Sequence, residues 1–183
     1  SKFSGNVIVE WNNVTAQSDV PVDFLWLNPQ IMRNGDAYVE ITAQQAGVCG
    51  TGLSGAPPVC TPLLSLKGYD PVRYAPLVHP GDSYSYDIFS QGAQAILHPT
   101  RISPLGALRV KELIATGESQ SAFYLDNYLR FGADAAAKLF DGFVIDADLH
   151  WTQPTAYRVP TVHLDGEDSA QPVTRASSPN VVT

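Results

Sequence analysis

The sequence is poor in cationic side chains and has no long hydrophobic segment. Its 183 residues include 11 Lys and Arg against 18 Asp and Glu, which gives a formal net charge of −7. Nucleic-acid binding depends on clustered Lys and Arg, and because these residues do not cluster along the chain, we expect no nucleic-acid partner. No stretch reaches the roughly 18 consecutive apolar residues that a membrane-spanning helix needs. We therefore expect no membrane span.

Cysteine is also scarce, with two residues in the chain. Cys49 and Cys60 bracket the segment CGTGLSGAPPVC, whose Gly and Pro content is typical of a loop. Whether the two form a disulfide or stay as separate thiols is open. A disulfide would favour a secreted or periplasmic protein; otherwise localisation is open, although the first 30 residues show no signal-peptide pattern. A structural zinc site at these cysteines is not expected, because the second pair of metal ligands that it needs is missing. We also expect no cofactor.

The chain as a whole is 44% hydrophobic, and it alternates short apolar runs with helical stretches. This alternation predicts one α/β domain with a doubly wound, mostly parallel sheet. We expect the domain to span residues 1–168, with a loop insertion around 43–80 and an irregular tail over 169–183. The predicted strands are 6–11, 37–42, 110–116, 143–147 and 159–164, and the predicted helices are 82–97, 120–131 and part of 19–33, where Pro21 starts the helix and Pro29 breaks it.

A short motif lies between the third predicted strand and its helix. It reads Gly117-Glu118-Ser119-Gln120-Ser121 and resembles the Gly-x-Ser-x-Gly nucleophile elbow, with Ser in place of the last Gly. Such a turn needs small residues at its first and last positions, because strand and helix pack closely around the serine. It also aims the serine at the N-terminus of the helix, where free N–H groups stabilise a developing oxyanion. The alternative is an ordinary helix N-cap serine.

Several segments extend the resemblance over most of residues 3–168. These are NVIVEWNNV, AYVEITAQQAGV, LKGYDPVRYAPLVHPGDSYSYDIFSQ, ELIATGESQSAFYLDNYL and LFDGFVIDA. Together they resemble a family of alpha/beta-hydrolase domain proteins whose elbow reads Gly-x-Ser-x-Ser. The resemblance implies a Ser-acid-His triad in that chain order and hydrolysis of an ester or a related acyl bond, with a small-molecule ester as substrate.

The resemblance also assigns roles to individual residues. Ser119 matches the nucleophile, and the backbone N–H of Gln120 matches the oxyanion donor that follows it. A second donor is expected at Asn12 or Asn13, after the first strand, where the alternative is a polar turn that ends the strand. The acid is expected on the turn after the fifth strand, with Glu167 first, Asp168 second and Asp165 third; the alternative is a solvated acidic loop.

The general base is missing from its expected place, because no histidine follows Glu167. His163, within a strand, and His98, before a proline, are expected to be structural; His79 is expected to order its loop, and His150 lies at the sheet edge that suits binding. Two explanations are open: a piece of a longer polypeptide, or a complete but degenerate domain. We expect the first explanation, because a sheet that stops after the acid-bearing strand would expose an edge. The sheet is then expected to be incomplete at its C-terminal end, and whether it is also incomplete at its N-terminal end is open. On this hypothesis the parent enzyme is active and this chain alone is not.

Two other classes of function compete with the hydrolase. A nucleotide-binding domain is disfavoured, because neither a Gly-x-x-x-x-Gly-Lys loop nor a Gly-x-Gly-x-x-Gly turn opens a helix after a strand. A non-catalytic binding or interaction module of the hydrolase fold stays open as the alternative, because it would keep the same elbow. The sequence leaves the acyl group, the alcohol and the oligomeric state open.

Overall fold

The computed structural model describes residues 2–15, 18–50, 65–148, 157–165 and 181–182. Six parallel strands form one sheet in the order β2-β1-β3-β4-β5-β6. The strands are β1 (Asn6–Trp11), β2 (Ala37–Ile41), β3 (Glu112–Glu118), β4 (Gly142–Asp146), β5 (Thr161–Leu164) and β6 (Val181–Val182). The predicted α/β class with a mostly parallel sheet is therefore confirmed.

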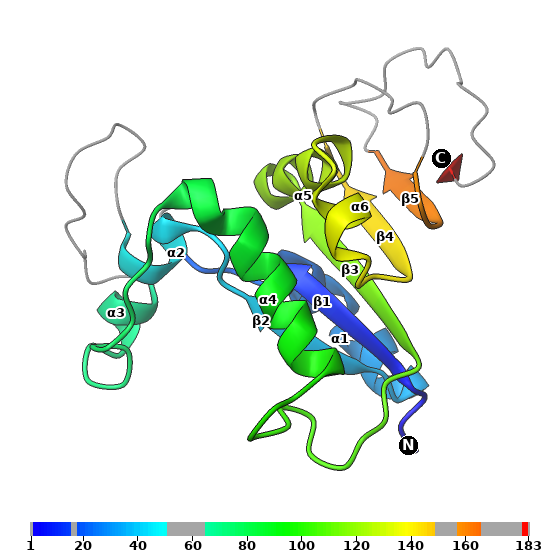
Figure 1. Cartoon of the computed structure of the whole chain (residues 1–183), viewed down its shortest axis with the longest axis horizontal. Helices are drawn as coiled ribbons and strands as arrows, with labels where there is room; N and C mark the ends of the chain where they lie inside the picture. Colours follow the sequence, from blue (N-terminus) through cyan, green and yellow to red (C-terminus); the bar gives the residue numbers. More distant parts are fainter. Residues whose placement is uncertain (1, 16–17, 51–64, 149–156, 166–180, 183) are drawn as a thin grey trace.

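Helices cover both faces of the sheet. They are α1 (Val22–Asn34), α2 (Gln45–Cys49), α3 (Leu66–Tyr69), α4 (Ser85–Leu97), α5 (Gln120–Arg130) and α6 (Ala133–Ala137), and the 3-10 turn η1 (Asp82–Tyr84) precedes α4. Figure 1 shows α4, α5 and α6 in front of the sheet and α1 behind it. No helix among the described residues is long and apolar enough to cross a membrane.

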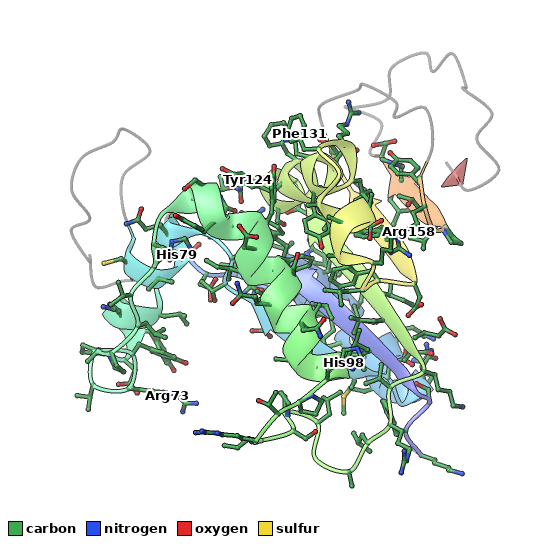
Figure 2. The ribbon with its side chains drawn as sticks, viewed as in Figure 1. Arg73, His79, His98, Tyr124, Phe131 and Arg158 are labelled. Carbon is green, nitrogen blue, oxygen red and sulfur yellow. The ribbon has the colours of Figure 1, made fainter. Side chains whose placement is uncertain are left out.

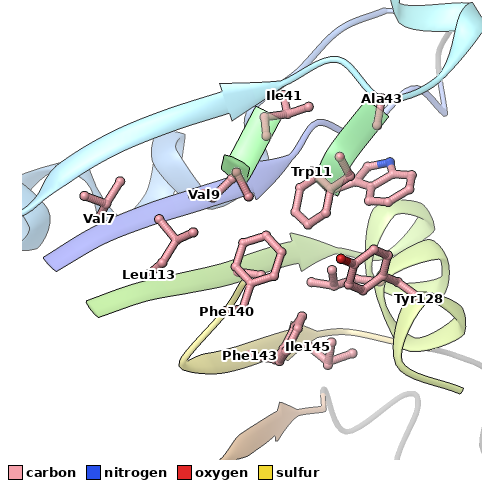
Figure 3. Close-up of a cluster of buried hydrophobic side chains, with 14 of the residues drawn as sticks. Val7, Val9, Trp11, Ile41, Ala43, Leu113, Tyr128, Phe140, Phe143 and Ile145 are labelled. Carbon is pink, nitrogen blue, oxygen red and sulfur yellow. The ribbon is translucent and has the colours of Figure 1, made fainter. Parts of the chain in front are cut away.

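The hydrophobic core lies between the sheet and the layer of α4 and α5. Alternate residues of the strands point into it, because successive side chains of a strand face opposite sides. Figure 3 shows these side chains gathered over β1, β3 and β4. An aromatic cluster fills the centre, with Phe89 of α4 at 4.9 Å from the Trp11 ring and 5.2 Å from the Phe140 ring, centroid to centroid. The core positions the carboxyl ends of β1, β3 and β4 at a common edge.

The structure differs from the sequence expectations at α1, which is one continuous helix with Pro29 inside it. The expected break at Pro29 is wrong. Proline has no N–H to donate to the carbonyl four residues before it. The side-chain amide of Asn28 takes this role, because its Nδ2 donates to the Leu25 carbonyl at 3.2 Å and to the Phe24 carbonyl at 3.0 Å. The preceding residue therefore repairs the gap that the proline leaves.

The region around 43–80 is less irregular than expected, because α2 and α3 lie within it, while residues 51–64 lie outside the described part. Cys49 ends α2 and is disulfide-bonded. The chain has one other cysteine, Cys60, which is outside the described residues. Most of the predicted irregular tail is also outside, but two of its residues form β6, a strand that the sequence did not predict.

Candidate active site

Ser119 occupies a sharp turn between β3 and α5. Its backbone has φ 55° and ψ −110°, a conformation that non-glycine residues rarely adopt and that costs on the order of 1–3 kcal/mol. Two backbone hydrogen bonds hold the turn: Ser119 N–H donates to the Asp146 carbonyl at 2.8 Å, and the Ser119 carbonyl accepts from Phe123 N–H at 3.0 Å. Ser119 side chain caps no N–H of α5. An ordinary N-cap serine has a backbone in the β region and a side chain that caps the helix, and Ser119 has neither, so this turn has the backbone geometry expected of an elbow.

The small residues of the motif have a visible purpose. A Cβ at Gly117 would lie 3.1 Å from the backbone carbon and oxygen of Ser121, a tight contact that would require the start of α5 to move away from β3 by a few tenths of an ångström. Ser121 is fully buried, and its hydroxyl donates to the Glu118 carbonyl at 2.8 Å while accepting from Glu118 N–H at 2.9 Å. A glycine at this position could form neither bond. Ser121, the residue that departs from the usual motif, thus joins the start of α5 to the end of β3 through two hydrogen bonds to Glu118.

The loop after β1 lies against the elbow. Asn13 Nδ2 donates to the Glu118 carbonyl at 3.0 Å and to the Glu118 carboxylate at 3.2 Å. The structure thus brings Asn12 and Asn13, both buried, to the side of Ser119. Their backbone N–H groups, however, already donate to other carbonyls, Asn12 to Ile41 at 3.2 Å and Asn13 to Val20 at 2.9 Å. For either N–H to meet an oxyanion, it would first have to leave that carbonyl.

The Gln120 backbone N–H begins α5, and the first N–H groups of a helix have no acceptor within it. The side chain of Gln120 ties this helix start to two other elements. Its Oε1 accepts from Val14 N–H at 3.1 Å, and its Nε2 donates to Gln44 Oε1 at 2.8 Å. Gln44 is buried and also accepts from the Trp11 indole N–H at 3.1 Å. Sequence reasoning missed Gln44, and nothing in its local pattern distinguishes it from other polar loop residues.

The elbow lies in an acidic surrounding. Burial raises the pKa of Glu118 above its usual value, and the neighbouring carboxylates of Asp146 and Asp23 raise it further. Burial likewise raises the pKa of Asp146 and brings that of Asp23 to about 6. Asp146 lies at the end of β4, opposite Glu118 in register. The rule that carboxyl ends of parallel strands share one edge would have placed Asp146 here from the sequence.

The expected acids are only partly within the described residues. Glu167 and Asp168 lie outside them. Asp165 directly follows β5 and is exposed, and partial burial together with the carboxylates of Asp148 and Asp146 raises its pKa. Asp148, which sequence reasoning did not single out, is buried at the same edge with 5% of its surface exposed. The turn after β5 thus lies within the electrostatic reach of β4.

None of the three described histidines forms a hydrogen bond with Ser119. His163 lies on β5, and its Nε2 is 2.9 Å from the Tyr157 hydroxyl. His79 joins its loop to the Ala43 carbonyl through Nε2 at 3.0 Å. His98 follows the last residue of α4, and Figure 2 shows it at the opposite end of this helix from His79. His150 lies outside the described residues.

Burial lowers the pKa of His163, and the charge of Arg130 lowers it further. The hydroxyl of Tyr157 also reaches Asp126 Oδ1 at 3.5 Å, and Asp126 pairs with Arg130. These four side chains form a polar group between α5 and β5, which accounts for the histidine without a catalytic role. Across the part of the chain that the structure describes, no group of three or more His, Cys, Asp or Glu is arranged to hold a metal ion.

A family model described as an alpha/beta hydrolase domain matches residues 1–181. No curated protein sequence matches the chain. The matched range contains β1 to β5, the first residue of β6 and the strained turn at Ser119. This chain therefore belongs to the alpha/beta hydrolase domain family.

Proposed function

We propose that this chain carries the nucleophile of a serine hydrolase that cleaves a carboxylic ester or a related acyl bond through an acyl-enzyme. The observation that supports this most directly is the backbone of Ser119, a non-glycine residue held at φ 55° between a central strand and a helix. Strain of this kind persists only where the surrounding structure enforces it, and it collects at functional sites. The family supports hydrolase activity in general, and the ester is our proposal.

In this proposal the Ser119 hydroxyl oxygen attacks the ester carbonyl carbon and gives its proton to a general base. The carbonyl oxygen becomes an oxyanion, which the Gln120 N–H stabilises at the N-terminus of α5. Collapse of the intermediate breaks the carbon–oxygen bond, and the alcohol leaves with the proton from the base. Water then releases the acid by the same steps.

We assign the acid of the triad to Glu167, with Asp168 and Asp165 as the second and third choices. The proposal gives the role of base to none of the three described histidines.

The acidic side chains of Glu118, Asp146 and Asp165 around the elbow disfavour a negatively charged ester, because each would repel it. We therefore propose a neutral or cationic small-molecule ester.

The alternative is a hydrolase-fold module that binds without catalysis. It would have the same fold and the same turn, so only reactivity separates the two. The engaged N–H groups of Asn12 and Asn13 favour this alternative, because they leave the proposed oxyanion site with one free donor from the predicted set.

The test is acylation of the full chain by a 4-nitrophenyl ester, with and without added imidazole. Imidazole supplies a base if the chain holds none in the correct place. We expect mass spectrometry to find the acyl group on the peptide that contains Ser119. Ser119→Ala should lose it, whereas the matched variant Ser103→Ala, on a loop at the other edge of the sheet, should keep it. Equal acylation of all three proteins, or none in any, would contradict the proposal and favour the module.

A further inference from the structure

The loop after β1 contacts the residues on both sides of the nucleophile. Asn13 contacts the residue before Ser119, through its bond to the Glu118 carbonyl at 3.0 Å. Val14 contacts the residue after it, through the bond from its N–H to Gln120 Oε1 at 3.1 Å. Consecutive residues of the loop thus reach both neighbours of Ser119. A backbone donor for an oxyanion at Ser119 is expected from this stretch of loop.

Two of the N–H groups here are fixed by backbone pairing. Asn13 and Val20 exchange both of their hydrogen bonds, Asn13 N–H to the Val20 carbonyl at 2.9 Å and Val20 N–H to the Asn13 carbonyl at 3.0 Å, as an isolated antiparallel bridge. Asn12 N–H continues the alignment of β1 with β2 by donating to the Ile41 carbonyl at 3.2 Å. Freeing either group would leave the carbonyl of Ile41 or of Val20 without this hydrogen bond, which is unfavourable unless another donor replaces it.

The next two N–H groups donate to side chains. Thr15 N–H donates to Asn13 Oδ1 at 2.9 Å, a local turn within the loop itself. Val14 N–H donates to the amide oxygen of Gln120, which is the residue that follows the nucleophile. Of the donors Asn12 to Thr15, only Val14 therefore has an acceptor that belongs to the elbow and that side-chain rotation alone can remove.

We propose that Val14 N–H is the second oxyanion donor, and that the Gln120 side-chain oxygen occupies it until a substrate carbonyl takes its place. This inference rests on the proposed function. An amide oxygen is chemically close to the carbonyl oxygen of an acyl substrate, so one acceptor replaces another without leaving the N–H unpaired. Gln120 then supplies one oxyanion donor from its backbone, and its side-chain oxygen accepts from the other donor, Val14 N–H, in the absence of substrate.

The resting position of the Gln120 side chain is held from its other end. Gln120 Nε2 donates to Gln44 Oε1 at 2.8 Å, and Gln44 is itself fixed by the Trp11 indole N–H at 3.1 Å. Release of the Gln120 side chain thus breaks its hydrogen bonds with Val14 N–H and with Gln44 Oε1. Val14 N–H then forms a new hydrogen bond to the substrate carbonyl. The net cost is therefore that of one hydrogen bond.

The experiment uses the full chain labelled with ¹⁵N and phenylboronic acid as the probe. The Ser119 oxygen adds to the trigonal boron, the hydroxyl proton goes to solvent, and the tetrahedral boron carries the negative charge in place of the oxyanion. We expect the Val14 amide proton to shift downfield in the adduct, while those of Asn12 and Asn13 stay in place. Gln120→Ala removes the side-chain oxygen that competes for Val14 N–H. It should therefore tighten boronate binding about fivefold, the equivalent of one hydrogen bond.

Two controls separate this role from a structural one. Gln94→Ala, an exposed glutamine on α4, should leave the affinity unchanged. Val14→Pro, which removes the N–H, should bind about 100-fold more weakly than Val14→Ala, which shortens the side chain but keeps the N–H. An adduct without a Val14 shift, or weaker binding by Gln120→Ala, would overturn this inference alone. Absence of a tetrahedral boron signal would overturn the nucleophile, and with it both proposals.

Discussion

The two faces of the sheet are built from the same strands and yet carry opposite kinds of side chain. Toward α4 and α5, the alternate residues Val9 and Trp11 of β1 are fully buried in an apolar core. Toward α1, the residue between them is Glu10, which is also fully buried. One face therefore gains stability from apolar burial, whereas the other must satisfy a buried carboxyl group with hydrogen bonds.

Glu10 is satisfied by the start of α1, which has no side-chain cap of its own. Its carboxyl oxygens accept from Asp23 N–H at 2.9 Å and Phe24 N–H at 3.2 Å, and the Tyr38 hydroxyl donates to it as well. Among the described residues no cation pairs with Glu10. The difference between the faces teaches that the polar face is held by a few specific bonds, so it should be sensitive to pH, and the apolar face should not.

The largest effect is expected on the apolar face, at Phe89. Phe89→Ala should lower the free energy of unfolding by about 3–5 kcal/mol, because it removes a fully buried ring that contacts the rings of Trp11 and Phe140. Urea denaturation measures this. The matched control is Phe131→Ala, whose ring is 74% exposed and should cost less than 1 kcal/mol. Similar losses in the two variants would contradict an apolar face that dominates stability.

On the polar face, Glu10→Ala should lower the free energy of unfolding by about 2–4 kcal/mol. The substitution leaves the N–H groups of Asp23 and Phe24 without their acceptor, and it leaves a cavity beside Tyr38. Glu40→Ala is the control on the same face, since Glu40 is exposed on the neighbouring strand. A neutral effect of Glu10→Ala would mean that α1 does not depend on this carboxyl group.

The pH dependence should separate the two faces further. Burial raises the pKa of Glu10 from 4.5 to about 8, so between these pH values the folded protein holds a proton that the unfolded chain has lost. This contribution to stability is complete below the unfolded pKa and is lost as pH rises through about 8. The free energy of unfolding should thus fall by up to about 1.4 kcal/mol per pH unit in this window.

Glu10→Gln cannot titrate and should flatten this slope, while Phe89→Ala should lower the whole curve and keep its slope. Denaturation across this pH range checks both. Asp23 contributes a slope of the same sign over a narrower range at lower pH, because its pKa is raised from 3.8 only to about 6. An unchanged slope in Glu10→Gln would show that Glu10 is ionised in the folded protein.

The smallest effect is expected at Thr116, whose hydroxyl donates to the Asp23 carboxylate across the buried contact between β3 and α1. Thr116→Val keeps the shape and should lower the free energy of unfolding by about 1 kcal/mol. This hydrogen bond holds the pKa of Asp23 down, so its loss should raise that pKa above about 6. Carbon-detected NMR titration of Asp23 measures the change, and Thr42→Val, which affects Asp19 instead, is the control.

Local patterns in the sequence were enough for much of the fold. The predicted strands are confirmed at β1 to β5, because β-branched runs between turn residues signal strands at short range. The helix α5 begins at Gln120 as predicted. The two-residue β6 gives too short a pattern to detect, and the continuity of α1 depends on one amide that replaces a missing N–H. Prediction therefore fails where a single side chain overrides the local rule.

For the candidate site, the motif alone indicated the turn at Ser119, because Gly117 and Ser121 are the small residues that such a turn requires. It could not indicate which N–H groups of the β1 loop are already bonded, since the acceptors Ile41 and Gln120 are distant along the chain, and Val20 meets Asn13 only through the way the loop folds back. Nor could it indicate that Glu10 is buried and that burial raises its pKa, because burial depends on how α1 packs. Alternation along a strand is a property of neighbouring residues, whereas hydrogen-bond partners and desolvation are set by segments that meet after folding.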